Sequence, residues 1–460
     1  MEKRRDVELF QDAPLFKAFI TLAVPTVITQ IIMIIYNFAD TYFVGMTNNE
    51  NAVAALTVSM PVFIIMAALS NLFGVGGSSV IARLLGMNKP EKAKKAFAVA
   101  TYGGIFVALL YSIIIFFSSN ALIPLIGGDE FSFPYIKEYM FWTMVIGAVP
   151  SIMNNLFGHL VRSIGDSKQA SIGMSFGAIL NIILDPIFMF LILPSGKEVM
   201  GAAIATLISN IAACIYFIIY IIRHYNNGIF TLNIKHFTFK DKIFSNIVTI
   251  GIPAALSTTL AMVSNIFANK LLISESNQAI SGIGIAKKVN ALAFNINMGM
   301  TQGMLPLIAY NYASKNYDRM KKAVILMLSI TLGFSTICLI LYEVFAPFWI
   351  RIFMKDEAVV NFGVKFLRII AIAVPFCGIS YSLNTVFQAT KKRVSSFLLS
   401  ILRKGLFDIP LMFILKNAIG YMGVLWATPI AEVAGIIVAI VLFVIFLKSL
   451  KKEETLEEAL

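Results

Sequence analysis

Apolar runs of helical length, separated by short polar breaks, recur along the whole chain. A bilayer-spanning helix needs about 20 mostly apolar residues. By that measure the pattern predicts twelve membrane-spanning helices, near residues 14–44, 52–82, 93–118, 135–160, 168–193, 199–222, 243–273, 279–311, 320–345, 361–389, 394–415 and 421–447. No polar interval is long enough for a sizeable soluble domain, so the predicted fold class is an all-α polytopic membrane protein.

Composition and charge agree with this interpretation. The chain has 460 residues, of which 58% are hydrophobic and only 13% are charged, outside the usual range of soluble proteins. The net charge of +12 comes from lysines and arginines that gather in alternate connections. Because basic loops stay on the cytoplasmic side, the pattern predicts that both termini are cytoplasmic. Membrane topology therefore accounts for the charge, and we expect no nucleic-acid partner.

The two halves of the chain resemble each other. The matches keep nearly one spacing, 228, 227 and then 222 residues, at Pro25 and Pro253, Asn37 and Asn265, Lys94 and Lys321, and Gly201 and Gly423. Each half holds six helices, so the halves enter the membrane from the same side. A parallel pseudo-twofold axis along the membrane normal follows, as in transporters that rock two bundles against each other. We expect lobes at 1–225 and 243–460, joined by a slack cytoplasmic linker at 226–242.

Prolines inside three predicted helices are candidates for bends. Proline removes one backbone hydrogen bond and costs roughly 3 kcal/mol within an ordinary helix. Inside a membrane such a break survives where protein or water satisfies the freed carbonyl. Pro25 and Pro253 occupy matching places in the two halves, and Pro186 follows Asp185 directly. Each marks either a hinge or a fixed kink.

Carboxylates within the spans are the strongest chemical signal. Asp40 lies in "YNFADTYFVG" near the end of the first span, and Asp185 lies in the fifth. An aspartate at the bilayer centre costs about 2.5–3.5 kcal/mol on insertion scales, so it is functional by default. Asn181 precedes Asp185 by four residues and shares its helix face. Two carboxyl groups and amides in one pocket suit either a proton or Na⁺, and the sequence does not separate the two ions.

Three segments carry a family likeness that covers nearly the whole chain. They are "PTVITQIIMIIYNFADTYFVG", "SNLFGVGGSSVIARLLGMNKPEKAKKA" and "RSIGDSKQASIGMSFGAILNIILDPIF". With the duplicated twelve-helix pattern, they resemble the multidrug and toxic compound extrusion (MATE) family, in its DinF-related branch and MepA-like group. The resemblance implies a cation-coupled antiporter in the plasma membrane. Its coupling site would be formed by Asp40, Asn181, Asp185 and Thr206.

Further polar residues are weaker candidates for supporting or cavity-lining roles. They are Asn37, Asn154, Asn155, Asn265, Lys287, Lys288 and Glu432. The other branch of the family carries acidic residues in the seventh, eighth and tenth helices, which this chain lacks, so a cation site in the second half is doubtful.

The acidic residues of the second half have their own predicted partners. Asp408 lies near the repeat counterpart of Asp185 and follows Arg403 and Lys404 by one turn, which predicts a structural ion pair. We expect Glu432 to pair with the lysines at 287 and 288, with a charged cavity lining as the alternative.

These observations predict a secondary-active multidrug efflux antiporter that exports organic, often cationic, compounds in exchange for H⁺ or Na⁺. We expect drug-like small-molecule substrates, a monomer in the lipid bilayer, and no cofactor or bound metal apart from the coupling ion. The alternative is a lipid-linked oligosaccharide flippase of the same superfamily, with Lys287, Lys288, Arg368 and Arg403 converging on a pyrophosphate. Nucleotide-binding and hydrolase motifs are absent from the sequence, so we do not expect an enzyme.

Overall fold

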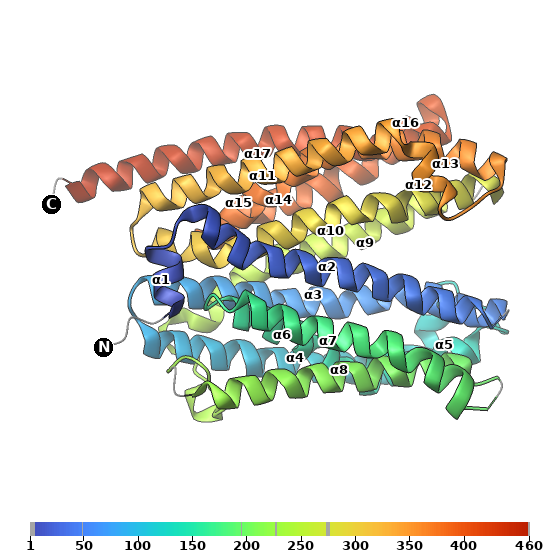
Figure 1. Cartoon of the computed structure of the whole chain (residues 1–460), viewed down its shortest axis with the longest axis horizontal. Coiled ribbons are helices and arrows are strands. Elements are labelled where there is room, and N and C mark those ends of the chain that lie inside the picture. The colour runs from blue at the N-terminus through green and yellow to red at the C-terminus, as the bar shows by residue number, and fades with distance from the viewer. Residues whose placement is uncertain (1–4, 48, 195, 226–227, 273–276, 459–460) are drawn as a thin grey trace. The chain divides into compact units, whose positions relative to one another are not determined.

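The computed structural model describes residues 5–47, 49–194, 196–225, 228–272 and 277–458, and these residues contain helices but no strand. Figure 1 shows that the helices are long and that those within one half run roughly parallel to each other. The first half contains α2 (Leu15–Gly45), α3 (Glu50–Gly86), α4 (Pro90–Leu125), α5 (Phe133–Met140), η1 (Phe141–Ile146), α6 (Ala148–Arg162), α7 (Ser167–Pro186), η2 (Ile187–Ile192) and α8 (Glu198–Arg223). A short helix, α1 (Arg5–Gln11), precedes them.

The second half repeats the pattern. It contains α9 (Ile243–Leu272), α10 (Asn277–Ala313), α11 (Tyr317–Val344), α12 (Ala346–Arg351), α13 (Glu357–Ala371), α14 (Ala373–Ala389), α15 (Arg393–Ile401), η6 (Leu402–Asp408), α16 (Ile409–Ile419) and α17 (Tyr421–Glu458). The short 3-10 turns η4 (Ile234–His236) and η5 (Lys240–Lys242) lie in the connection between the halves.

Each of the twelve predicted spans corresponds to one helix or one group of consecutive helices. Within the described ranges, nine helices are long and apolar enough to cross a membrane, and the pair α5–η1 and α6, bent by 52°, makes a tenth. The other two spans are α10 and the series α15, η6 and α16. Both carry lysines and other polar residues within their length, which lowers their apolar character.

The described helices form two compact units. Unit 1 comprises Met1–Thr259 and Leu305–Met320, and unit 2 comprises Leu260–Met304 and Lys321–Leu460. Parts of α9, α10 and α11 thus group with the first half of the chain. The division into lobes at 1–225 and 243–460, drawn from the repeat, stays a prediction.

The connection between the halves is packed near its start and mostly exposed farther along. Ile229, Phe230 and Thr231 are buried against unit 1, with at most 1% of each residue exposed. The hydroxyl of Tyr102 donates to the carbonyl of Leu232 at 2.5 Å. These three residues are therefore fixed on the first unit, whereas residues 233–242 are half-buried or exposed, and a slack linker stays a prediction for that stretch. Residues 226–227 of the predicted linker lie outside the described residues.

The three prolines have different local effects. Helices α2 and α9 continue through Pro25 and Pro253 as single helices. Helix α7 ends at Pro186 and passes into η2, a π-helical segment. Proline cannot donate to the carbonyl four residues earlier, that of Ile182, so the regular ladder ends here. The break predicted at Pro186 is therefore present.

Candidate functional site

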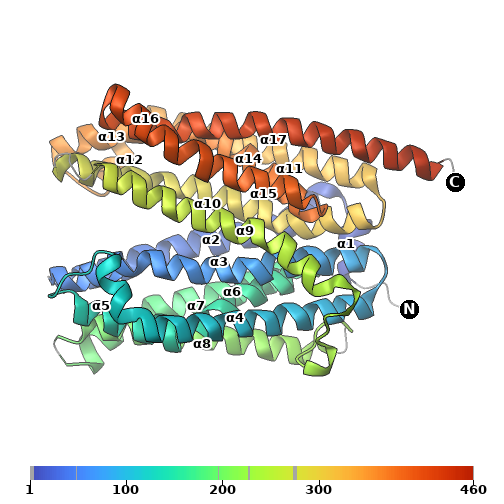
Figure 2. The same ribbon diagram turned by 180° about the vertical axis from the view of Figure 1, so that it is seen from behind.

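Four predicted residues of unit 1 come together from three helices. Helix α2 packs along α7, and α7 packs along α8. Figures 1 and 2 show α7 and α8 side by side. Asp40 on α2 is 9% exposed, whereas Asp185 on α7 is completely buried. The two carboxyl groups lie within electrostatic range of each other. Neither carboxyl therefore points freely into lipid.

Amides and a hydroxyl form a hydrogen-bonded network beside the acids. The side-chain amide of Asn181 donates to the hydroxyl of Thr206 on α8 at 3.2 Å. Asn154 on α6 donates to the side-chain oxygen of Asn210 at 3.1 Å, and Asn210 donates to the backbone carbonyl of Thr206 at 3.0 Å. Because each amide uses its nitrogen as a donor, its oxygen remains an acceptor.

Several buried oxygens of this network have no hydrogen-bond partner among the described residues. They are Oδ1 of Asp40, both carboxyl oxygens of Asp185, and Oδ1 of Asn154 and of Asn181. An acceptor buried without a partner costs about 1–3 kcal/mol, so such groups are rare and call for an explanation. Oxygen ligands without donors suit a proton or a hard cation.

Two tyrosines belong to the same site and were not singled out from the sequence. Tyr36 on α2 interacts with Thr206 and lies within electrostatic range of both carboxyls. Tyr139 on α5 lies within electrostatic range of Asp40, Asp185 and Tyr36. Tyr36 precedes Asp40 by four residues, which was a usable signal of a shared helix face. Nothing in the sequence near Tyr139 indicated its position.

The looser candidates of the first half have separate positions. Asn154 belongs to the network, but the amide of its neighbour Asn155 donates to the carbonyl of Ser151 in its own helix at 3.2 Å. Asn37 is exposed and its amide donates to the carbonyl of Met33 at 2.8 Å. Of the two asparagines weighed for α6, only Asn154 therefore bonds within the site network.

Comparison with known proteins matches both halves of the chain separately. The family model described as MatE matches residues 25–187 and again residues 250–414. The chain belongs to the MATE family. It is 32% identical over 433 residues to "Multidrug export protein MepA" of Staphylococcus aureus (strain MRSA252), covering 94% of each chain. It is 29% identical over 430 residues to the protein of the same name from Staphylococcus saprophyticus, again covering 94% of each.

Solved MATE structures share the fold. The structure titled "Outward-facing conformation of a multidrug resistance MATE family transporter of the MOP superfamily" superposes with a TM-score of 0.90 at 23% identity, covering 98% of this chain and all of that one. The all-α fold with twelve membrane helices in two lobes is thus the MATE fold. The protein is a multi-pass membrane transporter, and the relatives named above are transporters rather than enzymes.

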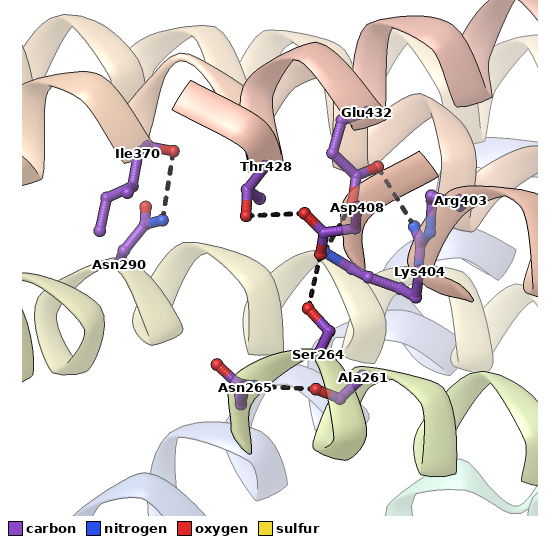
Figure 3. Close-up of polar contacts among 10 residues, drawn as sticks. All are labelled: Ala261, Ser264, Asn265, Asn290, Ile370, Arg403, Lys404, Asp408, Thr428 and Glu432. Atoms are coloured by element: carbon purple, nitrogen blue, oxygen red, sulfur yellow. Dashed lines mark hydrogen bonds and ion pairs between the residues drawn. The ribbon is translucent and has the colours of Figure 1, made fainter. Parts of the chain in front are cut away.

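The supporting candidates in the second half of this MATE protein do not form a matching site. The amide of Asn265 donates to the carbonyl of Ala261 at 3.0 Å, and the ammonium of Lys287 donates to Oδ1 of Asn269 at 2.9 Å. Glu432 is completely buried and pairs with Lys404 at 3.1 Å and with Arg403 at 3.6 Å (Figure 3). The expected pairing of Glu432 with Lys287 was wrong, because nearer cations on η6 reach its carboxylate. Lys288, the other predicted partner, is exposed on α10.

The ion pair predicted for Asp408 is present, with Lys404 one turn before it at 3.3 Å. The four basic residues weighed for a flippase have dissimilar surroundings. Arg403 is committed to Glu432, and Lys287 to Asn269. Arg368 is exposed and bonds to the carbonyl of Glu343 at 3.2 Å. These contacts do not bring the four basic side chains together in one pyrophosphate-binding site.

Proposed function

We propose that this MATE protein is a secondary-active multidrug efflux antiporter, which exports organic, often cationic, compounds in exchange for H⁺ or Na⁺. Its relatives at 32% and 29% identity are named multidrug export proteins and align over 94% of the chain. That extent of similarity supports the same class of cargo here. We propose further that it works in the plasma membrane as a monomer, with both termini cytoplasmic, as the distribution of basic loops indicates.

The single observation that carries the coupling mechanism is the cluster of unpartnered oxygens around Asp40 and Asp185. A carboxyl group shielded from water holds a proton more readily than an exposed one, and two neighbouring carboxylates repel each other. Taking up one proton or one Na⁺ relieves both penalties. In this proposal the cation enters from outside and is released inside, after the site becomes accessible to the cytoplasm.

Exchange with cargo follows from the same electrostatics. When the site is empty, the negative charge of the two acids favours an organic cation in the transporter. When a small cation binds, that attraction disappears and the cargo is released outward. The transporter thus alternates between a cation-loaded and a cargo-loaded state, and the ion gradient drives the cycle in one direction.

Dye efflux from inverted membrane vesicles tests the assignment. We expect Asp40→Asn and Asp185→Asn each to reduce gradient-driven efflux by about tenfold or more, because an amide neither holds a proton nor supplies a negative ligand. Glu130→Gln, which changes an exposed acid outside the helices, is the matched control and should transport normally at equal expression. Driving the same vesicles with a proton gradient and then with a sodium gradient identifies the coupling ion. Normal efflux in both aspartate variants would overturn the site.

A further inference from the structure

Unit 2 contains four charged side chains buried together, here called the unit-2 ion cluster: Arg403, Lys404, Asp408 and Glu432 (Figure 3). The ammonium of Lys404 lies between both acids, 3.3 Å from Oδ2 of Asp408 and 3.1 Å from Oε1 of Glu432. The contact with Glu432 is an ion pair, since neither oxygen of Glu432 accepts a hydrogen bond among the described residues. Asp408 and Glu432 are completely buried, and the side chain of Lys404 is 15% exposed. Two positive and two negative charges cancel within the cluster.

Hydroxyl groups and an aromatic ring complete the surroundings of the cluster. Ser264 on α9 donates to Oδ2 of Asp408 at 2.7 Å, and Thr428 on α17 donates to Oδ1 at 3.1 Å. The guanidinium of Arg403 lies over the ring of Tyr381 on α14, 4.6 Å from its centre. Without Lys404, the site would present two carboxylates and two hydroxyl oxygens, a set that suits a hard cation.

The contacts of unit 2 repeat those of unit 1, position by position. In unit 1 a Cβ on Gly177 would meet Ala213 at 2.9 Å and the amide of Asn154 at 3.7 Å. In unit 2 a Cβ on Gly435 would meet Arg403 at 3.2 Å, and Arg403 stacks on Tyr381. These contacts pair Gly177 with Arg403, Ala213 with Gly435 and Asn154 with Tyr381, at the same spacings of 222 to 227 residues that relate the halves in sequence.

The next turn of the same helices extends the equivalence. The hydrogen bond between Asn181 and Thr206 in unit 1 has its counterpart in the bond between Asp408 and Thr428. Asn210, which accepts from Asn154, corresponds to Glu432. The spacing grows by one residue between Arg403 and Asp408 because η6 is a π-helix, which accommodates an extra residue. Asp408 is therefore the counterpart of Asn181. The sequence comparison had placed it near the counterpart of Asp185, which lies one turn later.

The acids of unit 1 have no acidic counterparts in unit 2. At the same spacings, Asp40 corresponds to Ala268 and Asp185 corresponds to Met412. Both residues are buried in an apolar core cluster of unit 2, 6% and 2% exposed. Unit 2 thus has carboxylates at positions where unit 1 has amides of the network, and Lys404 lies between these carboxylates.

We propose that the ammonium of Lys404 is a built-in cation, standing in unit 2 where the equivalent network of unit 1 presents unpartnered oxygens to the coupling ion. Unit 2 then has no need of a mobile cation, and ion exchange proceeds through unit 1 alone. The inference rests on the proposed function of the unit-1 site. It assigns Lys404 a role in setting the number of ions exchanged per cycle, beyond packing.

Removing the ammonium should convert this cluster into a Na⁺ site. In Lys404→Ala the space of the side chain is vacated, and the carboxylates of Asp408 and Glu432 face only Arg403. Lys287, whose ammonium is bonded to Asn269, lies within electrostatic range of Asp408 but outside the cluster. Sodium that binds only the folded protein raises its thermal stability by mass action.

The experiment measures the melting temperature of the purified full chain in detergent, with about 0.2 M NaCl or with N-methyl-D-glucamine chloride at equal ionic strength. Asp40→Asn and Asp185→Asn form the background, so that the unit-1 acids do not contribute. With Lys404 intact we expect no sodium dependence. Adding Lys404→Ala should produce a saturable rise of about 3 °C in sodium, and adding Glu432→Gln as well should abolish it.

Two matched variants separate a cation site from a general loss of stability. Lys404→Met fills the space with an apolar chain and should show no sodium dependence. Lys416→Ala removes another lysine of unit 2, one that donates to the carbonyl of Leu271 at 2.7 Å, and should also show none.

A folded Lys404→Ala protein with equal melting temperatures in both salts would overturn the inference. A Lys404→Ala protein that folds only in sodium supports it, whereas one that folds in neither salt overturns it. This experiment measures sodium binding and not transport, so its outcome is independent of the efflux assay. Failure of the unit-1 assignment appears as normal efflux in the aspartate variants, and failure here appears as a flat sodium response.

Discussion

At the scale of single residues, two adjacent asparagines of α6 have opposite surroundings. Asn154 is 7% exposed and bonds across to Asn210, whereas the neighbouring Asn155 is half-buried and bonds within its own helix. We expect Asn154→Ala to lower the free energy of unfolding by about 1 kcal/mol, because it leaves the amide oxygen of the half-buried Asn210 without a donor.

Thermal unfolding of the purified protein measures this loss, with Asn155→Ala as the control. The control removes only a bond to a helix carbonyl and introduces the best helix former, so its effect should lie within about 0.5 kcal/mol. Equal losses in the two variants would contradict the network.

Much of the site was predictable at this scale: a buried acid, and an amide four residues before it, mark one helix face. Tyr139 was not predictable, because its position depends on how α5 packs.

At the scale of elements, α3 and α9 approach each other closely within unit 1. A Cβ on Gly251 would overlap the backbone carbonyl of Leu72, so the two helices touch through their backbones. We expect Gly251→Ala to destabilise the protein by about 1–3 kcal/mol or more, because a rigid backbone cannot move aside as a flexible side chain does. A lowered melting temperature is the measurement.

Gly333 on α11 provides the matched control. A Cβ there has nothing within 4 Å, so Gly333→Ala should be neutral or should stabilise its helix by up to about 1 kcal/mol. A melting temperature of Gly251→Ala as high as that of the unchanged protein would show that α3 and α9 are not in backbone contact.

The lengths and order of the helices followed from hydropathy, since every span must bury its backbone polar groups in a helix. Pro186 marked the break at which η2 begins, but the π-helical segments η1 and η6 and the 52° bend before α6 did not follow from the sequence pattern.

At the scale of the whole molecule, the connection between the halves is anchored to unit 1. Phe230 is completely buried, with its ring 5.3 Å from that of Phe97 and 5.7 Å from that of Tyr220. We expect Phe230→Ala to cost about 3–5 kcal/mol, the usual loss for a buried phenylalanine. Phe239 lies in the same connection but is 70% exposed, so Phe239→Ala should cost far less.

The melting temperatures of the two phenylalanine variants test whether the connection is anchored. Equally small decreases in both melting temperatures would show that it is not. The duplication predicted that the molecule has two parts, but not that stretches of α9, α10 and α11 group with the first half. Sequence repeats report ancestry. The contacts that define compact units form only after helices from both copies have packed.

The extra residue accommodated by η6 has a practical consequence for comparing the two copies. An alignment drawn without a gap inside Leu402–Asp408 slips by one position on one side of that segment, and each slip rotates the inferred neighbours by about 100° around the helix. An alignment of that kind would assign Asp408 the wrong counterpart in the first copy. Annotation of the second copy should therefore proceed from spatial neighbours, with letter matching used only as a guide.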